Sequence, residues 1–243
     1  MITTVKHAII TGASSGLGFE INKALTDIVG NGRSMWQVNN WSKETNVDVR
    51  DHDSIQKAAN YAINTWLDGM NLDLLVNCAG INKINYTPNV SVQEYNEVMD
   101  TNARAIFLVS QALLEQLRGG TIINIVSNAS HVPMTSSLAY NASKGAAAIM
   151  TRQMARELKK THDITVLSIS PNKMFGTGMS KDIDEQVCKL RGWTPEQAKA
   201  YQLAALPAGE ETNPAAVAEF IAFLMSSKER HKYLNGCDIP YGA

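Results

Sequence analysis

Hydrophobic residues in this chain occur alternately in short runs of strand length and in longer stretches with helical period. Such alternation is typical of βαβ units, whose strands form a parallel sheet. Strands are predicted at residues 5–10, 34–38, 46–49, 72–76, 121–126 and 164–169, with a last edge strand at 237–240. The pattern therefore predicts an α/β fold with a doubly wound parallel sheet.

The stretches between these runs repeat apolar residues every three to four positions, as helices do. Helices are predicted at residues 16–28, 53–66, 91–117, 138–159 and 213–225, with a short helix starting at 194. The sequence Ser91-Val92-Gln93-Glu94 has the pattern of a capping box, and Asp53 is expected to cap the second helix. Pro195 and Pro214 stand in the first turn of their helices, where proline is favoured.

Two segments depart from this rhythm. Only residues 39–45 separate the strands predicted at 34–38 and 46–49, too few for a normal crossover helix. Residues 172–193 have no clean period, and we expect an irregular segment over about 172–212 to act as a lid. Because no internal repeat, linker or low-complexity segment is present, one domain is expected over residues 1–243.

Composition narrows the classes of function. The 22 Lys and Arg residues nearly balance the 23 Asp and Glu and form no basic stripe, which argues against nucleic-acid binding. The sequence contains no apolar run of about 18 residues, which a membrane span would need, and no signal-peptide pattern. A cytoplasmic protein is therefore expected. The three cysteines and five histidines lack metal-ligand spacing, so neither a disulfide framework nor a metal site is expected.

A glycine-rich turn is predicted between the first strand and the first helix, in the sequence Thr11-Gly12-Ala13-Ser14-Ser15-Gly16-Leu17-Gly18. Glycines at such a junction allow a ligand to approach the backbone, and N–H groups of the following helix can hold a pyrophosphate. The spacing Gly-x3-Gly-x-Gly differs from the common dinucleotide fingerprint Gly-x-Gly-x-x-Gly. A turn of this kind could also serve only to connect a strand and a helix.

Three polar side chains are predicted to meet near the end of a strand. Tyr140 and Lys144 are four residues apart near the start of a predicted helix, so they point the same way. Such a pair is ordinary on a helix surface, but Ser127 follows the predicted strand 121–126, where ligands of doubly wound sheets bind. These residues are therefore candidates for one site.

Taken together, the features resemble the short-chain dehydrogenase/reductase family over nearly the whole chain. The matching residues are Thr11-Gly12-x3-Gly16-x-Gly18, Asp48-Val49, Asn77-Cys78-Ala79-Gly80, Asn102, Ser127, Tyr140-x3-Lys144, Pro171 and Thr177. The resemblance implies a single Rossmann-type domain. It also implies an NAD(P)-dependent oxidoreductase (EC 1.1.1.-) that transfers a hydride between a nicotinamide and a carbonyl or alcohol substrate.

The same resemblance implies a role for each matching residue. Tyr140 is expected to be the general acid for reduction or base for oxidation, while Lys144 supplies positive charge and binds the nicotinamide ribose. Ser127 is expected to hold the substrate oxygen, and Asn102 a water that connects Lys144 to solvent. The expected cofactor-binding residues are Gly12, Ser14, Ser15, Gly16, Leu17, Gly18, Trp41, Ser42, Lys43, Asp48, Val49, Asn77, Ala79, Gly80, Tyr140, Lys144, Pro171 and Thr177.

Three positions depart from the family pattern. Asn172 follows Pro171 where the family usually has Gly, and Thr177 lies one residue later than the family's carboxamide-binding Thr. Cys78 replaces the second Asn of Asn-Asn-Ala-Gly and is expected to be structural rather than catalytic. We therefore expect a modified nicotinamide end of the site.

The end of the second strand bears on the choice of cofactor. Residues 37–43 contain no acidic side chain to accept a hydrogen bond from a ribose 2′-hydroxyl, whereas Ser42 and Lys43 suit a 2′-phosphate. NADP(H) is therefore expected in preference to NAD(H). The alternative is that Lys43 is a solvated surface residue.

The substrate pocket is expected to have a mixed, polar lining. Its predicted residues are Asn128, His131, Met134, Asn172, Lys173 and Met179, with Trp193 from the lid. A large apolar ligand would leave amide and ammonium groups unpaired, so a small polar substrate is expected, such as a hydroxy acid or sugar-derived carbonyl compound. Alternatively, Asn172 and Lys173 contact cofactor or solvent.

The helices predicted at 92–117 and 138–159 are apolar over more than one stripe. A helix of this kind usually has a second surface to cover, and the resemblance implies a homodimer or homotetramer built on this pair.

Two other functions fit parts of the pattern. A nucleotide-binding sensor or scaffold without chemistry would have no need to keep Ser127, Tyr140 and Lys144 together. An epimerase or dehydratase of the extended relatives also uses Tyr-x3-Lys, but those chains are typically longer and have a differently spaced glycine turn. Substrate identity, direction and pathway are left open.

Overall fold

The computed structural model describes residues 5–27 and 35–242 of the chain. Six strands form one sheet there, in the order β2-β1-β3-β4-β5-β6, and every neighbouring pair is parallel. The strands are β1 Val5–Thr11, β2 Met35–Trp41, β3 Leu74–Asn77, β4 Thr121–Ile125, β5 Thr165–Pro171 and β6 Asp238–Tyr241. The strand order reverses between β1 and β3, so the predicted doubly wound sheet is confirmed.

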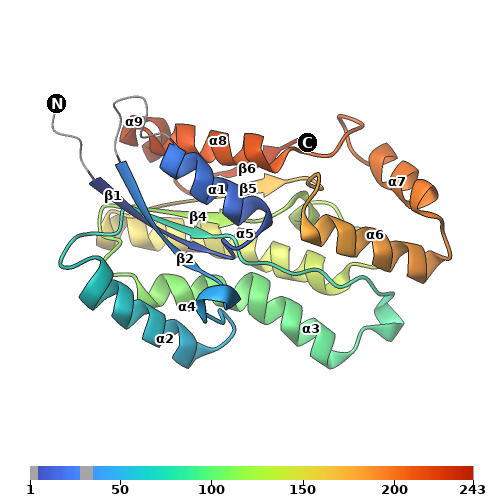
Figure 1. Ribbon diagram of the computed structural model, residues 1–243, viewed down its shortest axis with the longest axis horizontal. Helices are drawn as coiled ribbons and strands as arrows, with labels where there is room; N and C mark the ends of the chain where they lie inside the picture. Colours follow the sequence, from blue (N-terminus) through green and yellow to red (C-terminus); the bar gives the residue numbers. More distant parts are fainter. Residues whose placement is uncertain (1–4, 28–34, 243) are drawn as a thin grey trace.

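Helices cover both faces of this sheet (Figure 1). One face carries α1 Gly16–Asp27 and α8 Pro214–Met225, and the other carries α2 His52–Tyr61, α4 Ala105–Ala112 and α5 Leu138–His162. The remaining helices are α3 Val92–Met99, α6 Gly178–Arg191, α7 Pro195–Ala204 and α9 Lys228–His231. The helices α6 and α7 lie together at one end of the molecule. Among the described residues, no helix combines the length and the apolarity needed to cross a membrane.

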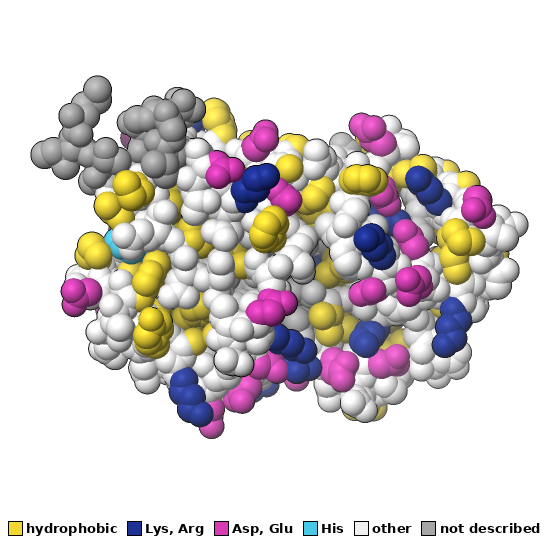
Figure 2. Space-filling model, in the orientation of Figure 1, with side chains coloured by type: hydrophobic (Ala, Val, Ile, Leu, Met, Phe, Trp, Pro, Cys, Tyr) yellow, Lys and Arg dark blue, Asp and Glu magenta, His cyan; other side chains and the backbone are white. Residues whose placement is uncertain are grey.

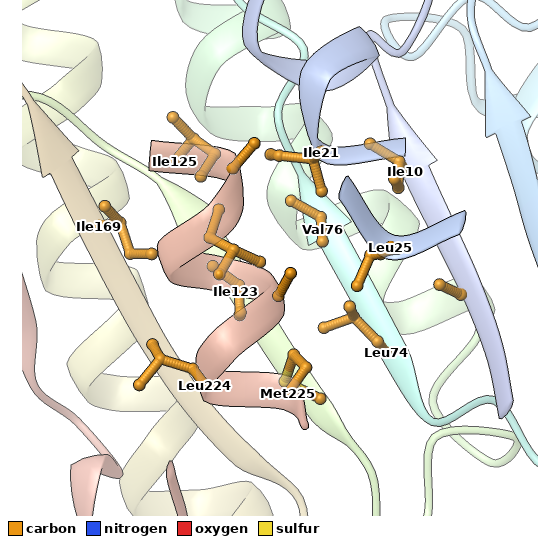
Figure 3. Close-up of a cluster of buried hydrophobic side chains, with 14 of the residues drawn as sticks. Ile10, Ile21, Leu25, Leu74, Val76, Ile123, Ile125, Ile169, Leu224 and Met225 are labelled. Atoms are coloured by element: carbon orange, nitrogen blue, oxygen red, sulfur yellow. The ribbon is translucent and has the colours of Figure 1, made fainter. Parts of the chain in front are cut away.

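Two hydrophobic cores form because successive side chains of each strand point to opposite faces. Ile10 and Ile123 belong to the core beneath α1 and α8, shown in Figure 3, whereas Ile9 and Ile122 belong to the core beneath α2 and α4. All four side chains are fully buried, and each contributes about 1.5–3 kcal/mol relative to an exposed position. The sheet is thereby a rigid platform for the residues at its carboxyl edge.

A set of buried polar side chains interrupts the apolar core at the end of β3. The Asn77 Nδ2 atom donates to Asn124 Oδ1 at 2.9 Å and to Ser110 Oγ of α4 at 3.3 Å. Asn124 in turn donates through Nδ2 to Thr151 Oγ1 of α5 at 2.9 Å. These bonds connect two strands to two helices and compensate for the water that each amide loses on burial.

Several local predictions were wrong. Residues 46–49 form no strand: the short link after β2 makes a single 3₁₀ turn at Lys43–Thr45, and the chain then runs directly to α2. Asp51, not Asp53, caps α2 and accepts the backbone N–H of Asp53. The predicted lid is helical rather than irregular, because α6 and α7 each begin at a threonine cap, Thr177 and Thr194. Residue 34 of a predicted strand and residue 28 of a predicted helix lie outside the described residues.

The predicted helix 91–117 is also corrected. Ser91 forms the expected capping box with Glu94, but a five-residue π-helix, Asp100–Arg104, separates α3 from α4. The residues after Ala112 form turns rather than helix. A π-helix widens the turn and displaces one backbone hydrogen bond, and such segments occur often at functional sites.

Candidate active site

The turn between β1 and α1 is closely packed around its glycines. Gly12 has a φ of 68°, and a Cβ atom there would lie 2.7 Å from the Cα of Ala79. A Cβ at Gly18 would overlap the carbonyl oxygen of Gly12. The first turn of α1 therefore lies directly against the loop, and its N–H groups offer the setting in which a pyrophosphate binds.

The loop that follows β3 is fixed against this turn. Thr11 Oγ1 accepts the backbone N–H groups of Cys78 at 3.0 Å and of Ala79 at 3.1 Å. A Cβ at Gly80 would lie 3.8 Å from Lys144 Nζ and 3.8 Å from the Cε of Met179. The absent side chain of Gly80 thus keeps open a space between the glycine turn, Lys144 and the start of α6.

The predicted catalytic residues Tyr140 and Lys144 lie one turn apart at the start of α5. The ammonium of Lys144 is 5.7 Å from the centre of the Tyr140 ring and donates to the carbonyl oxygen of Ile125 at 2.8 Å. Lys144 is only 4% exposed. The last carbonyl of β4 therefore holds this cation beside the phenol.

Burial dominates the protonation of this pair. Desolvation raises the pKa of Tyr140 above its ordinary value, and a hydrogen bond with the Ser127 hydroxyl opposes this shift. Desolvation also lowers the pKa of Lys144 from 10.5 to about 8. At neutral pH, Tyr140 thus keeps the proton that a general acid must donate, and Lys144 keeps its positive charge.

Asn102 lies within the π-helix Asp100–Arg104 and is almost fully buried. Its Oδ1 accepts the N–H of Ile81 at 2.8 Å, while its Nδ2 donates to the Ile81 carbonyl at 2.9 Å and to Ser143 Oγ at 3.0 Å. The amide thus joins the loop after β3 to α5 next to Lys144. Ser143, which the sequence analysis did not single out, completes this connection by donating to the Tyr140 carbonyl at 2.8 Å.

Cys78 lies on the same loop. Burial raises the pKa of its thiol to about 12, and the charge of Lys144 only partly opposes this shift. A thiol with so high a pKa is neutral and weakly nucleophilic at neutral pH, in keeping with the structural role predicted for it.

The residues expected to decide between NADP(H) and NAD(H) lie where β2 ends. Trp41 is buried, and its carbonyl oxygen accepts the N–H of Gly12 at 2.8 Å. Ser42 is also buried and donates to Glu44 Oε2 at 3.2 Å, whereas Lys43 is exposed. Glu44 lies just beyond the stretch used to predict the cofactor, so the sequence analysis missed this carboxylate.

Asp48 and Val49, also expected to bind the cofactor, lie in the link between the 3₁₀ turn Lys43–Thr45 and α2. Asp48 pairs with Arg50 at 2.7 Å, and the hydrogen bond from this guanidinium lowers the pKa of the carboxyl to about 2. Val49 is buried in the core beneath α2.

Thr177, one of the residues predicted to bind the cofactor, lies beside Gly16 of the glycine turn. A Cβ at Gly16 would lie 3.7 Å from the Thr177 side chain, and the Thr177 hydroxyl accepts the N–H of Ser180 to start α6. Pro171 is the last residue of β5. Helix α6 therefore begins directly beside the glycine turn.

Most predicted substrate residues form pairs with one another or with neighbouring elements. Asn128 Nδ2 donates to Asn172 Oδ1 at 2.8 Å, and His131 Nε2 lies 2.6 Å from Asp238 Oδ2 of β6. Met134 is exposed.

Lys173 and Trp193 do not line an open pocket. The Lys173 ammonium is bound by Asp184 at 2.6 Å and by Glu211 at 2.8 Å, which ties the loop after β5 to α6 and to the segment before α8. Trp193 packs within the lid, with its ring centre 5.1 Å from that of Tyr201. The partners of Lys173 are distant in sequence, and no local pattern indicated them.

Within residues 5–27 and 35–242, no group of three or more His, Cys, Asp or Glu side chains is arranged to hold a metal ion. The polar groups at the carboxyl edge instead surround the space between the glycine turn, Tyr140 and Lys144.

Known proteins resemble this one in both sequence and fold. A family model described as short chain dehydrogenase matches residues 6–187. The 3-oxoacyl-(acyl-carrier-protein) reductase FabG of Vibrio cholerae is 31% identical over 235 residues, which cover 91% of this chain and 90% of the relative. Sorbitol-6-phosphate 2-dehydrogenase of Klebsiella pneumoniae is 27% identical and covers 94% of this chain and 91% of its own.

A solved structure has the same fold. It is assigned as an NAD(P)-dependent gluconate 5-dehydrogenase from Beutenbergia cavernae and contains NADP. Its TM-score is 0.79 at 24% identity, covering 97% of this chain and 94% of that chain. The protein described here belongs to the short-chain dehydrogenase family and is an NAD(P)-dependent oxidoreductase.

Proposed function

We propose that the protein transfers a hydride between NADP(H) and a small polar carbonyl or alcohol compound, in an active site formed by Asn102, Ser127, Tyr140 and Lys144. The observation that carries the proposal is the buried Lys144 ammonium, held 5.7 Å from the Tyr140 ring at the carboxyl edge of the sheet. Burying a cation destabilises the fold, so its position beside a phenol calls for a chemical role.

The space bounded by Gly12, Gly16, Gly80 and Thr177 suits the cofactor. Gly12 lets the glycine turn pack directly against the backbone of Ala79, and Gly80 leaves its side-chain position free beside Asn102, Lys144 and Met179. The glycine turn, including Ser14, Ser15 and Leu17, would hold the pyrophosphate. The nicotinamide, when bound, supplies the hydride in reduction and accepts it in oxidation.

In the reductive direction, the Ser127 hydroxyl donates a hydrogen bond to the substrate carbonyl oxygen. Tyr140 then donates its phenolic proton to the same oxygen as negative charge develops there. The neighbouring Lys144 charge stabilises the phenolate that is left, and Asn102 keeps the connection from Lys144 toward solvent. In the oxidative direction Tyr140 takes the proton from the alcohol.

A Tyr140→Phe variant tests this assignment. It should lose turnover but keep its cofactor affinity, because only the transferable proton is removed. Ser14→Ala, on the glycine turn, serves as a control that should weaken cofactor binding with a smaller loss of kcat. If Tyr140→Phe kept a tenth of the wild-type rate, a loss of only about 1.4 kcal/mol, Tyr140 would not be the acid.

The same assay separates this function from the alternatives. A sensor or scaffold would bind NADPH without steady consumption, and an epimerase or dehydratase would convert substrate without net change in the reduced cofactor. Steady loss of NADPH absorbance with a carbonyl substrate, proportional to enzyme, supports the oxidoreductase proposed here.

The preference for NADP(H) rests on Lys43 and Ser42. Lys43 is exposed beside the end of β2 and forms no ion pair among the described residues, so its ammonium is available to a 2′-phosphate. The carboxylate of Glu44 would oppose this preference.

Titration of the wild type should give a lower Kd for NADPH than for NADH. Lys43→Gln should weaken the binding of NADPH and leave the binding of NADH unchanged. Tighter binding of NADH by the wild type would overturn the preference.

A small polar substrate is supported by the gluconate and sorbitol-phosphate names of the relatives. The pairs Asn128–Asn172 and His131–Asp238 do not themselves require a polar ligand, because these side chains already bond to one another. The name of the Vibrio relative favours a 3-oxoacyl thioester instead. Gluconate and sorbitol 6-phosphate with NADP⁺ should therefore be compared with acetoacetyl thioester and NADPH. A higher kcat/KM for the thioester would remove the small polar class.

We also propose that residues 1–243 form one domain, in which α6 and α7 act as the lid over the substrate. The Lys173 ion pairs and the position of Thr177 over Gly16 support a lid that closes on the cofactor side.

A further inference from the structure

The outer edge of β2 is open. Among the described residues β2 pairs only with β1. The Trp41 carbonyl accepts the N–H of Gly12 at 2.8 Å and so points toward β1, which turns the backbone groups of Trp36, Val38 and Asn40 outward. The Asn40 carbonyl accordingly accepts the Thr45 hydroxyl at 2.9 Å. The outward groups of Trp36 and Val38 have no partner strand among the described residues.

This edge also lacks the features that usually block strand pairing. The sequence of β2, Met-Trp-Gln-Val-Asn-Asn-Trp, contains no charged residue, no proline and no glycine. Exposed edges in natural proteins are normally protected by charge, by proline or by a covering element. An unprotected edge is suited to receiving another strand.

A groove of about 500 Å³ runs along the same edge. One wall is formed by residues 38–41 of β2, the other by Lys57, Ala58 and Tyr61 of α2 together with Trp66, and residues 45–47 close one end. Figure 2 shows hydrophobic side chains at the surface between β2 and α2. Of the residues expected to bind the cofactor, only Trp41 lines this groove, and no residue of the glycine turn and none of the proposed catalytic residues does, so the groove lies apart from the catalytic residues.

The groove offers three kinds of contact. Tyr61 is 60% exposed and, with Trp66, forms an aromatic wall. Lys57 is the one charged side chain that lines it, and among the described residues Lys57 has no ion pair. The Oδ1 atom of Asn40 is buried without a hydrogen-bond partner in the described part of the chain, so a bound donor would satisfy it.

We propose that this groove binds an extended acidic peptide, which adds to the sheet as a strand beside β2. Backbone N–H and C=O groups of the peptide would pair with those of Trp36 and Val38, and apolar side chains on alternate positions would pack against Tyr61 and Trp66. A carboxylate of the peptide would pair with Lys57.

A second copy of the chain fits the groove less well. Its own β2 carries no acidic side chain to pair with Lys57. The edge is also flanked by the wall of α2, which leaves room for a single strand more readily than for another folded molecule.

The test uses three fluorescein-labelled peptides with the full-length protein. Val-Thr-Glu-Thr-Val-Thr-Val, whose Glu and Val side chains share one face, should bind, its counterpart with Lys in place of Glu should bind about fivefold more weakly, and a version with Pro at the central Thr should not bind. Lys57→Glu should reverse the order of the acidic and basic peptides. Lys160→Glu, at an exposed position on α5, is the matched control and should leave the order unchanged.

Amide hydrogen exchange locates the contact. Binding of the acidic peptide should slow exchange at Trp36 and Val38 but not at residues of β6, the other edge. The proposal is overturned if these two amides are already protected in the protein alone, since another segment then covers the edge. Protection that appears only as protein concentration rises would show a second copy instead. Absence of binding at millimolar peptide, or binding insensitive to Lys57→Glu, would also overturn it.

Discussion

Lys144 shows at the scale of one residue how chemistry and stability oppose each other. Burial removes its ammonium from water, and the ammonium donates a hydrogen bond to the carbonyl oxygen of Ile125 instead. Desolvation lowers the pKa of Lys144 from 10.5 to about 8. The native state therefore holds this proton less tightly than the unfolded chain does.

This difference predicts how stability depends on pH. Between pH 8 and 10.5 the unfolded chain keeps the Lys144 proton and the native state releases it, so the free energy of unfolding should rise across that interval. The shift corresponds to a gain on the order of 3 kcal/mol. Urea unfolding of the wild type and of Lys144→Met at several pH values measures it, and parallel stability curves for the two proteins would contradict it.

The same titration predicts a pH profile for catalysis. Reductive kcat/KM should decline as pH rises through about 8, because neutral Lys144 no longer stabilises the Tyr140 phenolate. A Lys144→Arg variant keeps its charge at all these pH values, so its low residual rate should lack this decline. An equal decline in both proteins would assign the titration to another group.

The relative positions of the residues around Lys144 could be predicted from the sequence, while their catalytic roles stay a proposal. Ser127, Tyr140 and Lys144 were predicted to meet because each follows or begins an element at the carboxyl edge of the sheet, and the structure brings them together. Ser143 and Glu44 were missed. Their importance depends on a partner side chain, and nothing in a single sequence indicates which hydroxyl or carboxylate will face it.

At the scale of elements, the site depends on deviations from regular helices. The π-helix Asp100–Arg104 brings Asn102 against Ile81, and its hydrophobic period is too close to that of an α-helix to be detected in the sequence. The lid was misjudged for a related reason. α6 has a mostly polar sequence and buries only Ser180 and Val187, so few apolar residues mark it in the sequence although its threonine cap is clear.

The lid gives a prediction at this scale. Lys173→Met should leave Asp184 and Glu211 close together without a cation and loosen α6. KM for the substrate should rise, proteolysis between α6 and α7 should become faster, and the Kd for NADPH should stay nearly unchanged. Lys173→Arg should restore KM, and Lys189→Met, an exposed position on α6, should have no effect. Unchanged KM and proteolysis in Lys173→Met would remove this role.

At the scale of the whole molecule, α4 and α5 expose apolar side chains on one side. Phe107 is 49% exposed and Ile149 is 56% exposed. We expect these helices to form the contact of a homodimer or homotetramer. Light scattering at micromolar concentration should give a mass above 26.5 kDa, and Phe107→Glu with Ile149→Glu should reduce it to that of one chain. A wild-type monomer would contradict the expectation.

The arrangement of the sheet was predictable at this scale because alternating strands and helices allow few topologies. The open edge at β2 was not foreseen. A short link after the second strand was evident from the sequence, but a third strand was still expected at 46–49, and only the structure shows that this strand is missing and that a groove lies there.

The buried amides of Asn77 and Asn124 have a consequence for how the chain folds. In the native register these residues are direct neighbours on β3 and β4. A slip of one residue would turn the amide of the shifted strand to the opposite face of the sheet and leave both amides without each other as partners, at a cost of about 1–3 kcal/mol for each unpaired group. The apolar residues of both strands would tolerate such a slip, since they are bulky on either face. The amide pair therefore favours the native register of β3 and β4 over a slipped one.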